Sequence, residues 1–123
     1  MKLIKILNDI FKLEILVIAN CSTKEANEYF KKIKNKYFIE DDKNTVGQLV
    51  KAFHGQYRII YLEKLNKSQR SRAELVHELF HLVIRICEDK GVPNVPNIHT
   101  GHCGDETGAY LIEFYYNKIM EKV

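Results

Sequence analysis

The residues with the clearest chemical potential are His77 and His81, which flank Glu78 in the pattern HExxH. On a helix, residues four apart lie on one face about one turn from each other, so both imidazoles can reach a single ion. Zinc accepts neutral imidazole nitrogen, and two such ligands leave places for a third protein ligand and a water. Glu78 is then placed to take a proton from that water. The pattern therefore predicts a hydrolytic Zn²⁺ site with Glu78 as the general base.

The segment around the motif favours this prediction. Residues 73–87 are apolar on nearly every face and are long enough for about four helical turns. Such a pattern is typical of a central, largely buried helix. Two histidines and a glutamate inside that helix would be costly to desolvate without partners, and a bound cation would serve all three. The metal-free alternative is a pair of helix histidines hydrogen-bonded to neighbouring carboxylates.

A hydrolytic zinc site also needs a third protein ligand that leaves one coordination position open. The acids Asp105 and Glu106 begin the predicted last helix, which returns along the HExxH helix after a loop. We prefer Glu106, because the small residues Gly108 and Ala109 that follow it would let the two helices approach closely. Without a metal, both acids would complement the positive end of the helix dipole.

The loop ahead of that helix holds three more possible ligands, His99, His102 and Cys103. A metzincin would carry its third histidine at the position of Cys87, so the metzincin pattern is absent. A fourth protein ligand from the loop would close the coordination shell and make the site structural rather than catalytic.

Tyr110 is the candidate donor to the oxyanion that forms during hydrolysis. It lies four residues after Glu106 and therefore on the same face of the predicted helix. A hydroxyl at that place would donate a hydrogen bond to the developing negative charge. The alternative role of Tyr110 is packing, with its hydroxyl at the surface. Further candidates for the donor are Tyr115, Tyr116 and His102.

The elements that must position these side chains indicate a small α+β domain. Runs of β-branched and aromatic residues predict strands over residues 13–19, 46–53 and 57–63, the last two joined as a β-hairpin at His54-Gly55-Gln56. Apolar residues at helical spacing predict helices over residues 22–37, from about 70 to Lys90, and over 105–121. Ser22 and Glu25 have the spacing of a capping box for the first of them.

Composition narrows the classes of function. With 123 residues the chain supports one domain, residues 1–123, and its net charge of +3 does not indicate nucleic acid as a partner. We interpret the lysine run at residues 31–36 as the solvated face of a helix, with a phosphate-binding patch as the alternative. Three widely spaced cysteines, no secretory signal and no membrane-spanning stretch favour a cytoplasmic protein without a membrane partner.

Three segments together carry a family likeness. They are the strand-like run YRIIYL at 57–62, the block ELVHELFH at 74–81 and the block DETGAYL at 105–111. In these features the chain resembles the small zincin-like metallopeptidases encoded by phages and prophages, relatives in fold of the minimal gluzincin core of the ImmA/IrrE group. In the phage group an Asp-Glu pair followed by a small residue and Ala-Tyr-Leu recurs near the C-terminus.

The resemblance implies a fold, a site and a reaction. The fold would be a minimal zincin-like domain, with a short, mostly antiparallel sheet packed on a central HExxH helix and with an N-terminal and a C-terminal helix. His77 and His81 would be zinc ligands, Glu78 the general base and Glu106 the third ligand. The expected function is zinc-dependent hydrolysis of a peptide or protein substrate. The alternative is a catalytically silent zinc-binding phage protein that acts as a binding or assembly module.

Overall fold

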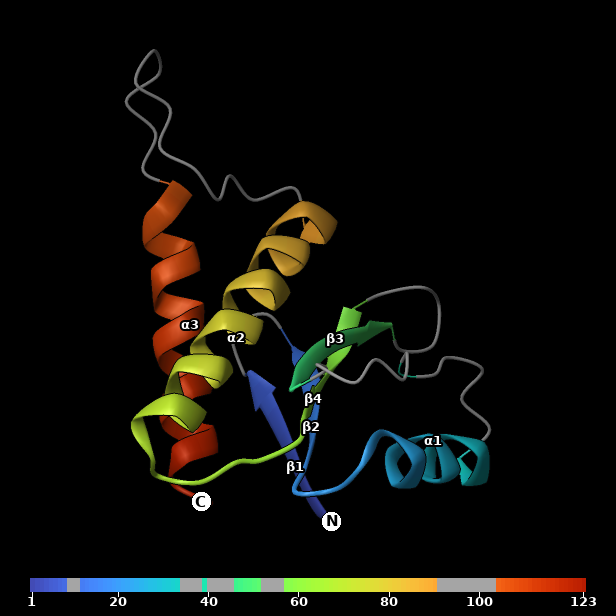
Figure 1. Cartoon of the computed structure of the whole chain (residues 1–123). Coiled ribbons are helices and arrows are strands. Elements are labelled where there is room, and N and C mark those ends of the chain that lie inside the picture. The colour runs from blue at the N-terminus through green and yellow to red at the C-terminus, as the bar shows by residue number, and fades with distance from the viewer. Residues whose placement is uncertain (9–11, 34–38, 40–45, 52–56, 91–103) are drawn as a thin grey trace.

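The structure is a computed structural model, and it describes residues 1–8, 12–33, 39, 46–51, 57–90 and 104–123 (Figure 1). The elements of the described residues are β1 (Lys2–Asn8), β2 (Leu13–Ala19), α1 (Thr23–Lys32), β3 (Gly47–Lys51), β4 (Tyr57–Leu62), α2 (Gln69–Lys90) and α3 (Gly104–Met120). Together they form a small α+β fold, as predicted.

The strands form a mixed sheet in the order β1-β2-β4-β3. β1 pairs with β2 and β3 pairs with β4 in antiparallel orientation, whereas β2 and β4 are parallel. The predicted pairing of the 46–53 and 57–63 strands is confirmed, and the turn predicted at 54–56 lies outside the described residues. A parallel pair needs a long crossover connection, and α1 lies within the connection from β2 to β4. In the described sheet, β3 is an edge strand beside β4.

β1 is a strand that the sequence did not predict. Its side chains alternate, with Ile4 and Ile6 buried and with Leu3 and Leu7 exposed at 43% and 51%. Because leucines occupy exposed positions, the segment lacks the alternation of apolar and polar residues by which a half-buried strand is recognised. Pairing with β2 along its whole length stabilises β1 where its own pattern does not.

α1 begins as predicted but is shorter. The Ser22 hydroxyl accepts a hydrogen bond from the Glu25 amide at 3.2 Å, and the Glu25 carboxylate accepts one from the Ser22 amide at 3.3 Å, which completes the capping box. The helix ends at Lys32, because Asn27 binds the backbone of Ile39 through both its amide atoms, at 2.7 and 3.0 Å. Residues 34–37, which we also predicted to be helical, lie outside the described residues.

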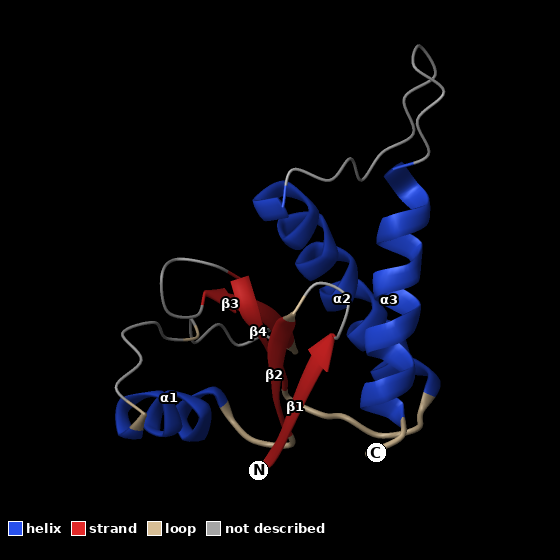
Figure 2. Cartoon of the chain, turned by 180° about the vertical axis from the view of Figure 1, so that it is seen from behind, coloured by secondary structure: helices blue, strands red, loops and turns tan. Residues whose placement is uncertain are grey.

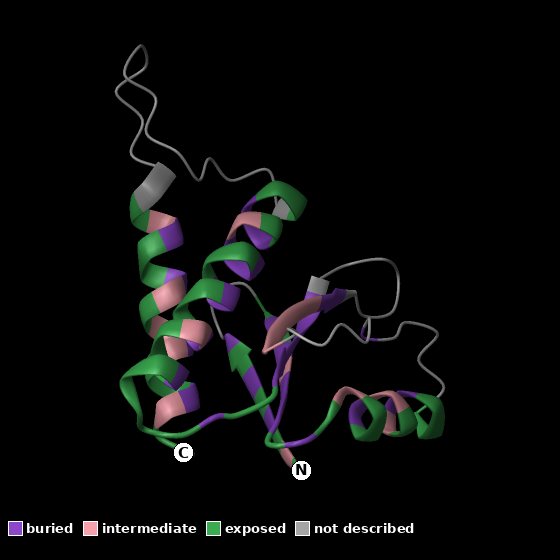
Figure 3. Cartoon of the chain, viewed as in Figure 1, coloured by how far each residue is buried: buried purple, intermediate pink, exposed green. Residues whose placement is uncertain are grey.

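Helices lie on both faces of the sheet (Figure 1, Figure 2). Ile60 and Leu62 of β4 belong to the core that α2 and α3 cover, whereas Ile59 and Tyr61 belong to the core beneath α1. Successive residues of a strand point to opposite faces, so β4 is buried on both sides (Figure 3). The α2 side of the sheet is therefore held by a core independent of α1.

Polar contacts attach α2 to its surroundings near both ends. At the start, the buried Ser71 hydroxyl accepts a hydrogen bond from the Asn66 amide at 2.9 Å and donates one to the Lys64 carbonyl at 3.1 Å. At the end, Asp89 forms an ion pair of 3.2 Å with Arg58 of β4, a residue only 8% exposed. The end of α2 at Lys90 agrees with the prediction.

α3 agrees with the predicted final helix to within one residue at each end. Leu111, Tyr115 and Ile119 are buried, whereas Ala109, which we expected to lie where the two helices approach each other, is exposed. Its position on the outward side of α3 explains the difference, because Gly108 next to it is the residue that faces α2. No helix in the described ranges is both long enough and apolar enough to cross a bilayer.

Candidate functional site

The motif lies at the centre of α2, which is buried on one face and open on the other (Figure 3). Leu75 and Leu79 are fully buried, while Val76 and Phe80 are 42% and 54% exposed, and both motif histidines are exposed as well. The prediction that this helix is largely buried is therefore wrong for its outer face. The sheet and α3 cover only part of the helix circumference, so the argument from desolvation holds for Glu78 alone.

The two histidines have the spacing of ligands to one ion. The Nε2 atoms of His77 and His81 lie 3.3 Å apart, with the two rings nearly perpendicular at 80°. Two nitrogen ligands of a tetrahedral zinc, each at about 2.0 to 2.1 Å from the metal, are about 3.3 to 3.4 Å apart. Without a metal, the same separation brings the rings within reach of a long N–H···N hydrogen bond in which one imidazole donates.

Glu78 is buried between α2 and the edge strand β3. Only 6% of the residue is exposed, and its side chain lies against Gly47 at the start of that strand. Burial raises the pKa of the Glu78 carboxyl, the nearby His77 lowers it, and the carboxylate of Glu74 raises it further. A carboxylate with a raised pKa is a better proton acceptor near neutral pH, as a general base requires.

Glu106, the predicted third ligand, does not lie on the face of α3 that contacts α2. Gly108 faces α2, since a Cβ built on it would meet Val83 at 3.6 Å. Glu106 lies two residues earlier, about 200° around the helix, and it is exposed. Among the residues that the structure describes, no three His, Cys, Asp or Glu side chains are grouped to hold a metal. His99, His102, Cys103 and the side chain of Asp105 lie outside the described residues.

The tyrosines of α3 differ in their surroundings. Tyr110 is 40% exposed and its ring lies 6.1 Å from that of Phe114, centroid to centroid. Tyr115 is fully buried, and its hydroxyl donates to the Leu13 carbonyl at 3.4 Å. Burial raises the pKa of Tyr115 to about 12. The hydroxyl of Tyr115 is buried and already donates a hydrogen bond, so Tyr115 is excluded as an oxyanion donor. Tyr110 is accessible to solvent.

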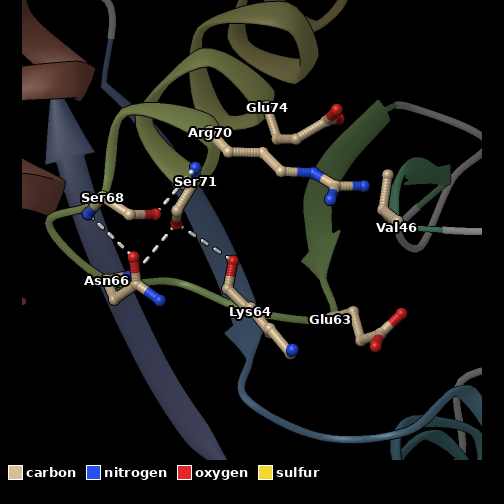
Figure 4. A pocket seen from close by; sticks show the side chains of 8 residues that line it. All are labelled: Val46, Glu63, Lys64, Asn66, Ser68, Arg70, Ser71 and Glu74. Carbon is tan, nitrogen blue, oxygen red and sulfur yellow. Dashed lines mark hydrogen bonds between the residues drawn. The ribbon is translucent and has the colours of Figure 1, made fainter.

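A cavity of about 320 Å³ opens beside the first turns of α2 (Figure 4). Its lining includes Val46, Glu63, Arg70 and Glu74, and Arg70 reaches across it toward Val46. Glu74 lies one helical turn before Glu78, which does not itself line the cavity. Sequence reasoning missed these lining residues and also Gly47. A glycine at the start of a predicted strand was the one signal for that contact.

Comparison of the chain with protein-family models, with curated proteins and with solved structures finds no match.

Proposed function

We propose that the protein is a zinc-dependent peptidase in which His77 and His81 bind the metal and Glu78 is the general base. The observation that carries the proposal is the 3.3 Å separation of the two histidine Nε2 atoms next to a buried carboxylate. Exposed imidazoles are accessible to an ion from solvent, and their separation fits two sites of a tetrahedral shell. The donor set of nitrogen and carboxylate oxygen is one that zinc prefers.

Glu78 would move the protons of the reaction. When bound, Zn²⁺ polarises a carbonyl and makes water acidic enough to lose a proton near neutral pH. Glu78 accepts that proton and delivers it to the amine that leaves when the peptide bond breaks. Its burial between α2 and β3 keeps bulk water away from the carboxylate and holds it in one place.

The proposal also includes a third zinc ligand, an oxyanion donor and a class of substrate. The family resemblance makes Glu106 our choice for the third ligand. Because Glu106 lies about 200° around the helix from Gly108, the residue that faces α2, Asp105 is its direct competitor. Tyr110 is the proposed donor to the oxyanion.

The substrate is an extended peptide. β3 is an edge strand of the described sheet and lies beside Glu78, so a peptide that pairs with the main chain of β3 would be brought to the histidines.

The test is a comparison of wild type with Glu78→Gln in zinc content and in cleavage of a broad peptide panel. The substitution keeps size and removes the basic oxygen, so zinc should stay bound while hydrolysis falls by about 100-fold or more. Glu88→Gln, at an exposed position of the same helix, is the matched control and should retain activity. Equal zinc in all three proteins with no cleavage by any of them would favour the non-catalytic binding module.

A further inference from the structure

Gly47 lies beside the side chain of Glu78, the candidate base, although the two residues are far apart in the sequence. A Cβ added to Gly47 would lie 3.3 Å from both Cγ and Oε1 of Glu78 and 3.2 Å from Cδ2 of Leu62. These distances are shorter than ordinary carbon contacts of about 3.5 to 4.0 Å. A side chain at this position would therefore require a neighbour to shift by a few tenths of an ångström.

The two neighbours differ in their freedom to move. Leu62 is fully buried in the core beneath α2 and is the direct pairing partner of Gly47 across the sheet. The Glu78 carboxylate is the end of a longer, flexible side chain, and the outer face of α2 next to it is open to solvent. A small shift of the Glu78 side chain is thus the cheaper response to a side chain at position 47.

The glycine is not required by its own backbone. The φ angle of Gly47 lies outside the left-handed region, so an L residue can adopt its conformation. Glycine in a strand lowers stability, because it loses more conformational entropy on folding and has no side chain to pack. The reason for glycine here is therefore the space that it leaves.

We propose that Gly47 is a positioning residue for Glu78: its missing side chain creates the space that holds the carboxylate between α2 and the edge strand β3. The positioning role rests on the proposed function, whereas the contact itself does not. Catalytic groups must be held within about 0.5 Å of their productive geometry, so the space beside Gly47 matters for the reaction.

The contact is tested in metal-free protein by a double-mutant cycle of Gly47→Ala and Glu78→Ala, read as thermal unfolding midpoints. In the protein that keeps Glu78, Gly47→Ala should lower the unfolding midpoint by about 3 °C or more. In the Glu78→Ala background the contact with Leu62 remains but the contact with Glu78 is gone, so the same change should lower the midpoint clearly less. Gly108→Ala is the matched control, since its Cβ meets only Val83 at 3.6 Å and should behave alike in both backgrounds.

An equal loss from Gly47→Ala in both backgrounds would overturn the proposal. If Gly47→Ala alone does not fold, recovery of folding in the double variant supports the contact, and failure of both refutes it.

The positioning role has a second readout in the zinc-loaded protein. Gly47→Ala should lower kcat by about tenfold or more with a smaller change in KM and with zinc affinity kept, and it should have no further effect in Glu78→Gln. Coupling in the cycle without peptidase activity in wild type would refute the proposed function and leave the contact standing. Activity without coupling would refute the role of Gly47 and leave the peptidase standing.

Discussion

At the scale of single residues, the three motif side chains occupy opposite environments. His77 and His81 face solvent, whereas Glu78 is 6% exposed and lies against Gly47 of another element. Spacing along one helix determines the separation of the histidines, so the sequence predicts it well. The place of Glu78 depends on a strand about thirty residues earlier in the chain, and no local pattern encodes such a contact.

The third ligand is tested at this scale. If Glu106 binds zinc, Glu106→Gln should weaken zinc affinity by about 100-fold or more, because losing even an outer-shell partner costs about 10- to 100-fold. Asp105→Asn and the double substitution of His99 and His102 by Ala are compared in the same competition titration with a zinc chelator. Glu113→Gln, exposed on the same helix, serves as control.

A loss confined to Asp105→Asn would transfer the ligand role to that residue. A loss confined to the histidine double variant would transfer it to the loop.

At the scale of elements, the sequence predicted what local signals encode. The positions of β2, the start of α1, the end of α2 and both ends of α3 follow from runs of apolar residues and a capping box. β1 and the end of α1 were missed, because pairing with β2 and the bonds of Asn27 to Ile39 act across the fold. The open face of α2 was missed for the same reason, since burial depends on which elements cover the helix.

The contact between α2 and α3 makes Gly108→Ala a prediction about an element. The added Cβ meets Val83 at an ordinary 3.6 Å, so the helix gains without a clash. Alanine in place of a helix glycine should raise the free energy of unfolding by about 0.5 to 1 kcal/mol. Urea denaturation followed by circular dichroism measures the change. A decrease would show that the two helices cannot accept even one methyl group between them.

At the scale of the whole molecule, the sheet joins two cores, one under α2 and α3 and one under α1. The Lys2 ammonium donates a hydrogen bond to the Lys122 carbonyl, and the two termini lie at the same end of the molecule (Figure 2). Each core contains a buried cysteine, Cys87 in the first and Cys21 in the second. Ionisation of these thiols therefore concerns the stability of the entire domain.

Stability should fall at alkaline pH. Burial raises the pKa of Cys21 and of Cys87 above the ordinary 9.0 and that of Tyr115 from 10.0 to about 12. Above about pH 9 the unfolded chain releases these protons while the folded chain retains them, so unfolding becomes more favourable as pH rises. The loss amounts to at most about 1.4 kcal/mol per pH unit for each group.

Urea midpoints at pH 7, 9 and 10.5 measure this loss. Tyr115→Phe removes one of the three groups and should make the decline above pH 10 less steep, at the cost of the hydrogen bond to the Leu13 carbonyl. A midpoint independent of pH across this range would contradict the prediction.

The attachment of α2 near both of its ends has a consequence for the middle of the helix, which carries His77 and His81. Ser71 secures the beginning of the helix to the segment after β4, and Asp89 secures its last turn to Arg58 within the sheet. A roll of α2 about its own axis would have to break one of these contacts, so the helix face that carries His77 and His81 keeps its direction. Preorganisation of this kind means that capture of a metal would demand little rearrangement of the backbone.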